Sequence, residues 1–442
     1  MGVPIMRSSR KMLPLAAAAG AAVVSVAMAA PAAAAVTTLY VDKANGQCSN
    51  SGPGTQTTPF CTISGAAAKV VAGQTVQVSA GTYSEKVTVA RSGTSGAPIV
   101  FAAASGATVT VTGGADGFVL SGKSNVAIRG FRITATSGPG ITASSGSNLT
   151  IAGNDVSGAG KRVNGSTAKG ISLSGITNST ISGNVTHDNS DAGIGLGSGS
   201  NGNTLTGNNS YANARGYSRA AAGIDLRNST GNTVSANLLH NNEDSGLNIW
   251  TSSSNTLAVN NSVYNNGDHG IDVHSTNDAR VVANTVYKNY DSGIEMTGSL
   301  RTVLANNISA DNGINSARTS GQLRADSTSA ASTVADYDLL NQSAPLGSKT
   351  VFIDWAGTKY ATLAAFTKAT GKEAHGIQAD PQLAANLHLT AGSPAIDSAN
   401  AAAPGEPAKD ADGRSRVDIA GVPNTGAGSP PYADRGAFEF RG

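Results

Sequence analysis

Apolar and polar residues alternate in short phrases that recur along the middle of the chain. Each phrase is a glycine, an apolar residue, any residue and a second apolar residue, as in GISL and GIDV. The glycines are spaced 30, 23, 30, 23, 24 and 23 residues apart. A nearly fixed period of this kind indicates a solenoid, in which each repeat packs on its neighbours. The phrases begin at Gly140, Gly170, Gly193, Gly223, Gly246, Gly270 and Gly293.

The local pattern decides which solenoid the repeat builds. Each phrase alternates with a period of two, contains β-branched residues and is bounded by Asn or Gly. No helical stripe lies between the phrases, which excludes leucine-rich and helical repeats. Short strands that stack in register form parallel sheets with neighbouring strands about 4.8 Å apart. The sequence therefore predicts an all-β fold, a right-handed parallel β-helix.

Two polar columns accompany the repeat. A second apolar phrase ends on an asparagine, and stacked asparagines bond to one another and to the bending backbone, so we expect this column to be structural. It comprises Asn154, Asn184, Asn208, Asn237, Asn260, Asn284 and Asn306. An aspartate also precedes the strand glycine by two residues, either as a turn cap or as part of a site. These aspartates are Asp191, Asp244, Asp268 and Asp291.

The ends of the chain depart from the repeat. Residues 36–116 contain a predicted helix from about Ile63 to Val71 and the first coils, while residues 117–313 hold the regular coils. A helix at the start would cover the open end of the core. Within 314–442 the repeat is lost. There we expect the last coils, a short helix in YATLAAFTKATG, a cap and a loop-rich tail.

Residues 1–35 are typical of a secretory signal peptide. Basic residues at Arg7, Arg10 and Lys11 precede an alanine- and valine-rich run and then small residues. A membrane anchor is the alternative, but the run is rich in alanine rather than leucine and no second long apolar span follows. We therefore expect a secreted, extracellular protein that has no membrane contact after cleavage.

Cys48 and Cys61 are the two cysteines of the chain, and a short loop separates them. A disulfide is the expected state in an exported protein. Two free thiols, or half of a metal site, are the alternatives. The second of these lacks further cysteines to complete a sulfur cage.

Outward positions of the strand phrase carry the candidate chemistry. When its apolar residues face the core, its third and fifth residues face outward. From Gly223 onward these change from small residues to polar and aromatic ones in a chain with only 13% charged residues. A solvated face is the alternative, but an exposed Trp250 would be costly in water. The candidate substrate-binding and catalytic residues are Asp225, Asn248, Asp272 and Glu295 at the third position and Arg227, Trp250 and His274 at the fifth.

Two repeats carry insertions immediately before this strand, at 158–169 and 213–222. Because both lie on the same edge, we expect them to form a basic wall that steers a polyanionic chain. The net charge of +2 is too small to indicate nucleic acid. We therefore expect an acidic polysaccharide as the partner of a monomer. The basic residues of the insertions are Lys161, Arg162, Lys169, Arg215 and Arg219.

Acids beside basic residues suit β-elimination on a uronic acid. The proton next to the sugar carboxylate becomes acidic when that carboxylate is neutralised, and Ca²⁺ held by hard oxygen ligands would do this. The predicted ligands are Asp244, Asp268 and Asp272. His274 or Arg227 would then remove the proton as the base. Two carboxylates on neighbouring coils also fit hydrolysis, so a glycosidase stays open.

The chain resembles secreted bacterial β-helix proteins related to the family 9 pectate lyases. The resemblance rests on the opening LYVDKANGQCSNSGPGTQTTPFCTI, the Gly-Ile-x-Leu coils and the endings LHLTAGSPAID and DRGAFEF. Lyases, epimerases and proteins without known activity share these markers. The family's calcium motif, Asp-Asp-Gly-apolar-Asp, is similar to 268–272, with Asp244 as the acid one coil earlier. His269 replaces one ligand, and the later phrase GIEM offers Glu295 but not the family's catalytic lysine.

A second resemblance is to the β-helical mannuronan C5-epimerases. Their motif Gly-Phe-Asp-Pro-His is similar to 270–274, which carries over Asp272 and His274. The family's tyrosine is His269 here, and the aspartate of its next coil is Thr297. We therefore expect a polysaccharide lyase acting on a uronic-acid polymer such as pectate. A C5-epimerase and a non-catalytic glycan-binding or envelope protein are the alternatives.

Overall fold

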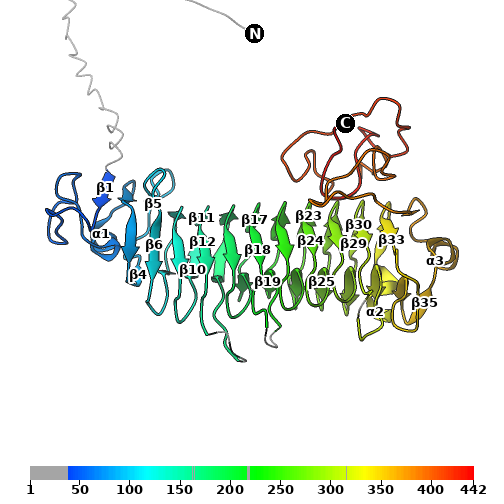
Figure 1. The fold of residues 1–442 in the computed structure, drawn as a ribbon, viewed down its shortest axis with the longest axis horizontal. Helices are drawn as coiled ribbons and strands as arrows, with labels where there is room; N and C mark the ends of the chain where they lie inside the picture. Colours follow the sequence, from blue (N-terminus) through cyan, green and yellow to red (C-terminus); the bar gives the residue numbers. More distant parts are fainter. Residues whose placement is uncertain (1–37, 162, 164, 217–219, 315) are drawn as a thin grey trace, which may run out of the picture. The chain divides into compact units, whose positions relative to one another are not determined.

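The computed structural model describes residues 38–442 except 162, 164, 217–219 and 315. Its strands form three sheets of 12 strands, and each regular coil gives one strand to each sheet (Figure 1). Paired strands run parallel in all three sheets, apart from the antiparallel pair β34 and β35. The predicted right-handed parallel β-helix is confirmed.

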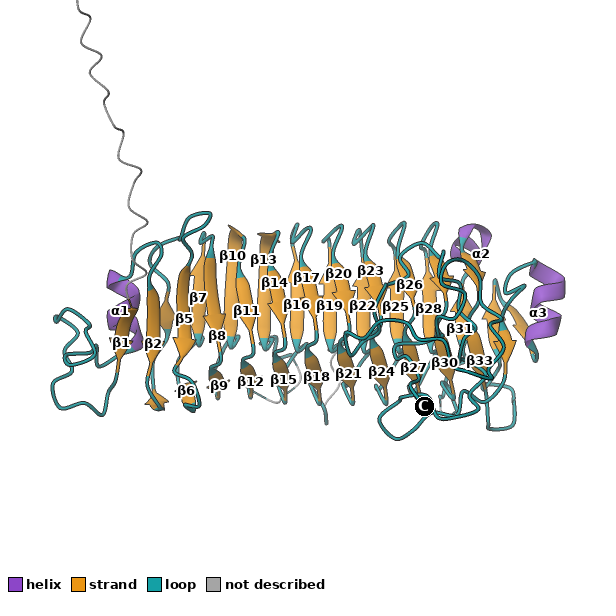
Figure 2. Ribbon diagram, turned by 90° about the horizontal axis from the view of Figure 1, so that it is seen from above, coloured by secondary structure: helices purple, strands orange, loops and turns teal. Residues whose placement is uncertain are grey.

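The strands of each sheet lie side by side along the stack of coils (Figure 2). Sheet 1 comprises β1 (Thr38–Val41), β2 (Thr75–Val78), β5 (Ile99–Ala103), β8 (Val126–Arg129), β11 (Thr150–Ala152), β14 (Thr180–Ser182), β17 (Thr204–Thr206), β20 (Thr233–Ser235), β23 (Leu257–Val259), β26 (Arg280–Val282), β29 (Val303–Ala305) and β32 (Val334–Asp336).

Sheet 2 contains the Gly-Ile-x-Leu phrases. It comprises β4 (Val87–Thr88), β7 (Phe118–Ser121), β10 (Ile141–Ser147), β13 (Ile171–Thr177), β16 (Ile194–Gly197), β19 (Ile224–Arg227), β22 (Leu247–Trp250), β25 (Ile271–His274), β28 (Ile294–Thr297), β31 (Leu323–Ala325), β34 (Ile353–Trp355) and β35 (Thr358–Tyr360).

Sheet 3 completes each coil before the chain returns to sheet 2. It comprises β3 (Gly81–Tyr83), β6 (Val109–Thr112), β9 (Arg132–Thr134), β12 (Asp155–Ser157), β15 (Val185–His187), β18 (Asn209–Tyr211), β21 (Leu238–His240), β24 (Ser262–Tyr264), β27 (Thr285–Tyr287), β30 (Ile308–Ala310), β33 (Leu339–Asn341) and β36 (Ile377–Gln378).

Apolar residues of the strand phrases stack inside the coils. Ile171 pairs with Ile194, and Ile194 pairs with Ile224. All three side chains are fully buried in one core cluster. Burial of each such side chain is worth about 1.5–3 kcal/mol. The predicted inward direction of the apolar positions is therefore confirmed.

The asparagine column is a ladder of side-chain hydrogen bonds. The Asn237 side chain accepts from the backbone N–H and the side-chain amide of Asn208, and donates to Leu205 and Asn261. A parallel ladder runs through the next turn of each coil. The first ladder comprises Asn154, Asn184, Asn208, Asn237, Asn261, Asn284 and Asn307. Its predicted structural role is confirmed.

Two members of the predicted column are wrong by one residue. Asn260 and Asn306 precede the ladder positions and adopt left-handed backbone with φ of 56° and 59°. Asparagine tolerates this conformation well. Their side chains donate instead to the C-terminal tail, Asn260 to the carbonyl of Lys409 and Asn306 to that of Asn400.

A short helix covers the beginning of the core. Helix α1 (Ile63–Lys69) starts at the N-cap Thr62, whose side chain accepts the N–H of Gly65. It ends two residues before the predicted Val71 because Val70, with φ of -54° and ψ of 139°, no longer has helical backbone. The predicted disulfide between Cys48 and Cys61 is present just before this helix.

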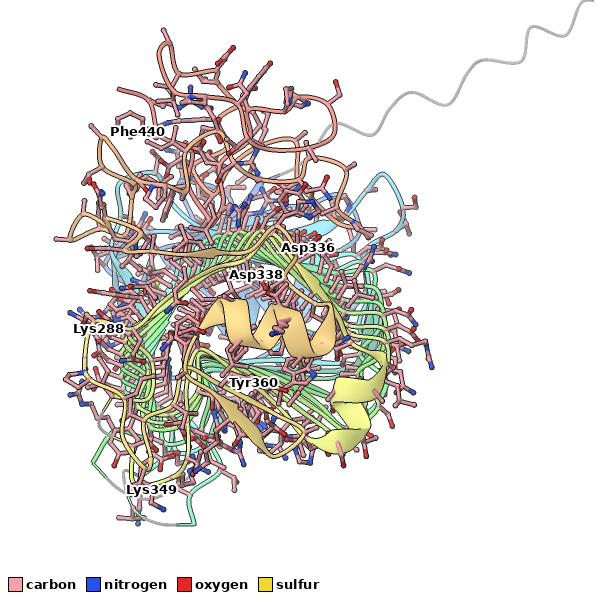
Figure 3. The ribbon with its side chains drawn as sticks, turned by 90° about the vertical axis from the view of Figure 1, so that its right-hand side faces the viewer. Lys288, Asp336, Asp338, Lys349, Tyr360 and Phe440 are labelled. Carbon is pink, nitrogen blue, oxygen red and sulfur yellow. A yellow bond between two sulfur atoms is a disulfide. The ribbon has the colours of Figure 1, made fainter. Side chains whose placement is uncertain are left out.

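The opposite end has one predicted helix and one that the sequence did not indicate. Helix α3 (Leu363–Thr370) lies across the end of the coils, between the N-cap Thr362 and a left-handed Gly371 (Figure 3). Helix α2 (Ser327–Ser332) was not predicted. The coils also continue beyond 313, as far as β36. Within 314–442 the Gly-Ile-x-Leu phrase is no longer recognisable in the sequence, but the coils themselves continue.

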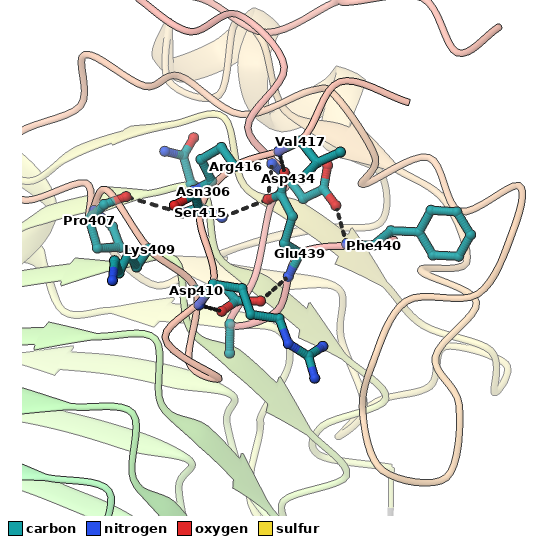
Figure 4. A network of polar contacts seen from close by, with 12 residues as sticks. Asn306, Pro407, Lys409, Asp410, Ser415, Arg416, Val417, Asp434, Glu439 and Phe440 are labelled. Atoms are coloured by element: carbon teal, nitrogen blue, oxygen red, sulfur yellow. Dashed lines mark hydrogen bonds and ion pairs between the residues drawn. The ribbon is translucent and has the colours of Figure 1, made fainter. Parts of the chain in front are cut away.

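The C-terminal tail binds back to the coils through buried polar groups. Arg435 donates to the carbonyls of Ser398, Asp338 and His375. Within the tail, Arg416 bridges Glu406 and Glu439. Figure 4 shows Arg416 and Glu439 in this network. The tail is thus tied to the last coils rather than being a separate body.

Rings stack on the outer side of sheet 3. His187, Tyr211, His240 and Tyr264 follow one another with centroids 4.8–5.0 Å apart and nearly parallel planes. This aromatic ladder follows the same coil-to-coil register as the apolar core. No sequence pattern described above predicts this ladder.

The predicted signal peptide lies outside the described residues, and the domain boundaries at 35, 116 and 313 stay predictions. Among the described residues, no helix is long and apolar enough to cross a membrane.

We expect Asn237→Ala to lower the free energy of unfolding by about 3 kcal/mol, because unsatisfied buried polar partners cost about 1–3 kcal/mol each. Chemical denaturation would measure it. The matched control is Asn424→Ala, at an exposed tail position. Equal stability of the two variants would contradict the ladder's energetic role.

Candidate functional site

Coil-to-coil register aligns the predicted residues in two columns on sheet 2. Asp225 pairs with Asn248, Asn248 with Asp272, and Asp272 with Glu295. We call these four residues the acid column. The outer column lies beside it and contains Arg227, Trp250, His274 and Thr297. The predicted alignment on one wall is therefore confirmed.

The acid column is buried, which corrects the expected exposed face. Asp225, Asn248, Asp272 and Glu295 are only 4%, 0%, 5% and 7% exposed. Side chains from neighbouring positions fold over the three acids and provide hydrogen bonds, as buried charges require, whereas both polar atoms of the Asn248 side chain are buried without a partner among the described residues. Only the outer column keeps substantial contact with solvent, and even Trp250, expected to be exposed, is half-buried.

Two residues of the outer column hold the acids beneath them. Arg227 Nε lies 3.0 and 2.9 Å from the two carboxylate oxygens of Asp225. The Trp250 indole N–H donates to Asp272 over 2.7 Å. The guanidinium of Arg227 also stacks over the Trp250 ring, 4.4 Å from its centroid, in a cation–π contact. These bonds make one connected layer over the column.

His269 and Glu295 form a buried ion pair. His269 Nε2 lies 3.0 Å from Glu295 Oε2, and Arg324 Nη1 lies 3.1 Å from both oxygens of that carboxylate. Burial alone would lower the pKa of His269, but the hydrogen bond and charge of Glu295 raise it to about 9. Burial would raise the pKa of Glu295, but His269 and then Arg324 lower it to about 2. Both groups are therefore charged at neutral pH.

Carboxylates gather in the turns that precede the strands of sheet 2. Asp268 donates its backbone N–H to the carbonyl of Asp244, and Asp291 donates to that of Asp268. Burial, followed by the charge of Asp268, raises the pKa of Asp244 to about 8. The guanidinium of Arg318 forms ion pairs with both Asp268 and Asp291. A distant loop thus contributes a cation to this turn cluster.

Two of the three predicted calcium ligands, Asp244 and Asp272, keep a buried oxygen that is available to a cation. Asp244 Oδ2 and Asp272 Oδ1 are buried without a hydrogen-bond partner. Side-chain ligand atoms of Asp268, His269 and Asp291 also lie within 4.8 Å of one another, which is a different set from the predicted one. Three cations, His269, Arg318 and Arg324, face five acids, and the raised pKa of Asp244, about 8, leaves that carboxyl largely protonated at neutral pH. The acids are Asp244, Asp268, Asp272, Asp291 and Glu295.

The two predicted bases differ in their surroundings. Arg227 is held on Asp225. The His274 ring has no hydrogen bond to the part of the chain that the structure describes, and its centroid lies 5.5 Å from that of Trp250. Burial and then Glu295 raise the pKa of Asp272 to about 6, against the opposing effects of His269, Trp250 and His274. Because Arg227 is engaged by Asp225 whereas the His274 ring is not hydrogen-bonded by the described residues, His274 is the better placed proton acceptor.

The predicted basic wall is only partly assembled around the acid column. Lys169 Nζ lies 4.0 Å from Asp225. Its side chain occupies the space beside Gly195, where an added Cβ would come within 2.4 Å of it. Arg215 instead lines a hollow beside the turns that follow sheet 3. Arg219 and Arg162 lie outside the described residues.

Three charged residues of the site were not among the predicted site residues. His269 was treated only as the replacement of a metal ligand. Arg324 pairs with Glu295 across the coils, and the sequence signal for it was the phrase GQLRA at 321–325, which continues the strand register. Arg318 lies in a loop without a repeat, so no periodic signal indicated it.

Comparison with known proteins identifies the family and the fold. The family model described as "Pel9A-like, right handed beta helix region" matches residues 39–349. A search of curated proteins found no match.

Solved structures share the fold at low identity. XylC, in a complex with xylose, is 14% identical, with a TM-score of 0.56 over 79% of this chain and 87% of that chain. The A-module of the Azotobacter vinelandii mannuronan C-5 epimerase AlgE6 is 17% identical, with a TM-score of 0.52 over 70% and 92%. These identities establish the fold alone.

We expect the thermal stability of the protein to fall as the pH rises from 6.5 to 9. The pKa of His269, about 9 when folded, exceeds its ordinary 6.5, so its stabilisation is complete below pH 6.5 and is lost through pH 9. Glu295, with a pKa of about 2 against 4.5, stabilises above pH 4.5 and ceases to do so as the pH falls through 2. His269→Gln should flatten the alkaline slope of the melting temperature, whereas His375→Gln, at an exposed position, should not. Identical slopes for both variants would contradict the ion pair.

Proposed function

Because the chain belongs to the Pel9A-like right-handed β-helix family, we propose that it cleaves a uronic-acid polysaccharide, such as pectate, by β-elimination. The observation that carries the proposal is the outer column, in which a half-exposed His274 lies beside Trp250 and Arg227 above buried acids. A histidine whose ring nitrogens are not hydrogen-bonded by the protein can accept a proton from a substrate as a general base. The aromatic ring and the guanidinium supply the stacking and charge that an acidic sugar requires.

Each residue of the outer column has a separate role in the proposed reaction. His274 removes the proton from the carbon next to the sugar carboxylate, the bond to the glycosidic oxygen breaks, and a carbon–carbon double bond forms while the departing oxygen takes a proton from water. Arg227 stays charged on Asp225 and binds the substrate carboxylate. Asp272 positions Trp250 through the indole N–H. Lys169 and Glu295 border this row and take part in substrate binding.

We propose calcium as a second source of positive charge. Asp244, Asp268 and Asp272 would hold the ion, and the unpartnered oxygens of Asp244 and Asp272 support this assignment. When bound, the ion would neutralise the carboxylate of the substrate and so make the neighbouring proton more acidic.

Export of the protein is part of the same proposal. A polymer substrate cannot cross a cell membrane intact, and residues 1–35 have the pattern of a signal peptide. We propose that the mature chain acts outside the cell as a monomer.

A non-catalytic glycan-binding protein is the second candidate. It is favoured by the bonding of the acid column, in which Asp225, Asp272 and Glu295 are all engaged by neighbouring side chains. Such a network would be compatible with a purely structural role. A C5-epimerase would use the same proton abstraction without cleavage.

Incubation with polygalacturonate and with alginate tests the proposed reaction. A lyase produces an unsaturated sugar that absorbs in the ultraviolet, and His274→Ala should lower kcat about 10²–10⁴-fold because general-base catalysis contributes that much. His375→Ala is the matched control at an exposed position. Proton exchange at carbon 5 without cleavage would indicate an epimerase, and binding without either reaction the non-catalytic candidate.

Removal of divalent cations tests the proposed metal. Chelation should reduce turnover, and added Ca²⁺ should restore it, because without the ion the substrate carboxylate loses the charge that neutralises it. Calorimetric titration with Ca²⁺ should detect binding to the wild type and much weaker binding to Asp244→Asn. Calcium binding that is unaffected by this substitution would place the ion elsewhere.

A further inference from the structure

A hollow of about 500 Å³ opens beside the turns that follow sheet 3, away from the outer column of sheet 2. Its volume lies within the range of small-ligand sites in proteins. The lining mixes amides, two cations, one acid and one tyrosine with apolar surface, including Ile314, and the apolar part is the larger. Residues that matter for its chemistry are Arg215, Asn241, Asn265, Lys288, Tyr290 and Asp311.

The register of the coils builds one wall of the hollow. Asn241, Asn265, Lys288 and Asp311 each follow the last residue of a sheet 3 strand and have φ of 53–55°. The strands pair in register, so these left-handed residues occupy equivalent positions on four successive coils. Lys288 lies at the outer side of the coil wall (Figure 3). Polar side chains thus stand in a row with the spacing of the coils, about 4.8 Å.

The charge of the hollow favours an anion. Two cations, Arg215 and Lys288, and one acid, Asp311, line the hollow, and Arg215 also interacts with another part of the chain. Asp311 is also engaged, since it accepts the backbone N–H of Ser343 over 2.7 Å. A hydrogen bond with Tyr287 and the charge of Asp311 hold the pKa of Lys288 above its ordinary value. The hollow therefore keeps its positive charge over a wide pH range.

An exposed aromatic ring stands at the same hollow. Tyr290 is 45% exposed, which is uncommon for a large apolar side chain in this chain, where most are buried. An amphipathic ring with one face in solvent is suited to stacking on the apolar face of a sugar. The amides of Asn241 and Asn265 offer both donors and acceptors for sugar hydroxyls.

The hollow adjoins the turn cluster of Asp244, Asp268 and Asp291 through two turns. Gly267 and Tyr290 line the hollow, and the next residue along the chain is in each case a member of the turn cluster, Asp268 or Asp291. Added side-chain atoms at Gly267 would come within 2.2 Å of the carbonyl of Glu243, so the turn is closely packed there. A polymer that crosses these turns would contact both the hollow and the outer face of sheet 2.

We propose that this hollow is an accessory binding site for a carboxylate-bearing sugar unit of the polysaccharide. Lys288 and Arg215 bind the carboxylate, Tyr290 stacks on the sugar ring, and the amides bind hydroxyl groups. The site holds a neighbouring part of the polymer while the outer column acts on another. This inference rests on the proposed action on uronic-acid polymers.

Calorimetric titration with short oligogalacturonates and oligomannuronates tests the site, using the full chain in a His274→Ala background so that no ligand is consumed. The parent should bind at least one of the two oligosaccharides. Lys288→Gln and Tyr290→Ala should each weaken the binding of that oligosaccharide about tenfold, and rising salt should weaken it further. The matched control, Lys368→Gln on α3, should bind like the parent. Melting temperatures should be unchanged, because Lys288 and Tyr290 contribute no core packing.

Unaltered affinity in both Lys288→Gln and Tyr290→Ala would overturn the accessory site, as would equally tight binding of neutral cello-oligosaccharides. The two proposals fail separately. Binding that depends on Lys288 without any unsaturated product supports the hollow and contradicts the lyase. Unsaturated product formed with an unchanged KM in Lys288→Gln and Tyr290→Ala supports the lyase and contradicts the hollow.

Discussion

In-register hydrogen bonding between successive coils is the constraint on which the whole molecule depends. Because each strand pairs in parallel with its equivalent one coil away, every position of the repeat becomes a column in space. Apolar columns make the core, and asparagine columns satisfy the turns. The same rule stacks the rings of His187, Tyr211, His240 and Tyr264, and it places Asp225, Asn248, Asp272 and Glu295 in one row.

Columns of acids carry an energetic difficulty that the other columns lack. Like charges one coil apart repel, and burial removes the water that would screen them. The protein answers with one cation or donor for most of them: Arg227 on Asp225, Trp250 on Asp272, and His269 on Glu295. Asp244 has no such partner for one oxygen, and its pKa rises to about 8. Burial of these carboxylates therefore depends on the cations and hydrogen-bond donors beside them.

The period of the glycines was sufficient to predict the fold, the inward and outward faces, and the pairing of the acid column. Single-residue register was less secure, because VNN and ANN sequences present two adjacent asparagines and the period alone does not choose between Asn260 and Asn261. Burial of the acids could not be predicted at all. It depends on how outer side chains fold back and on Arg318, which lies 50 residues from Asp268 in a loop without periodicity. The sequence repeat predicts which residues align from coil to coil. Which loop side chains cover those residues is known only from the three-dimensional structure.

The C-terminal tail has a consequence for the evolution of the molecule. Most solenoids can gain or lose a whole repeat, since each repeat contacts only its neighbours. Here the tail contacts several coils at once, through Asn260, Thr285, Asn306 and Asp338. Duplication or deletion of a coil between these anchor points would leave the tail too short or out of phase. The contacts of the tail therefore restrict the number of coils in this part of the protein.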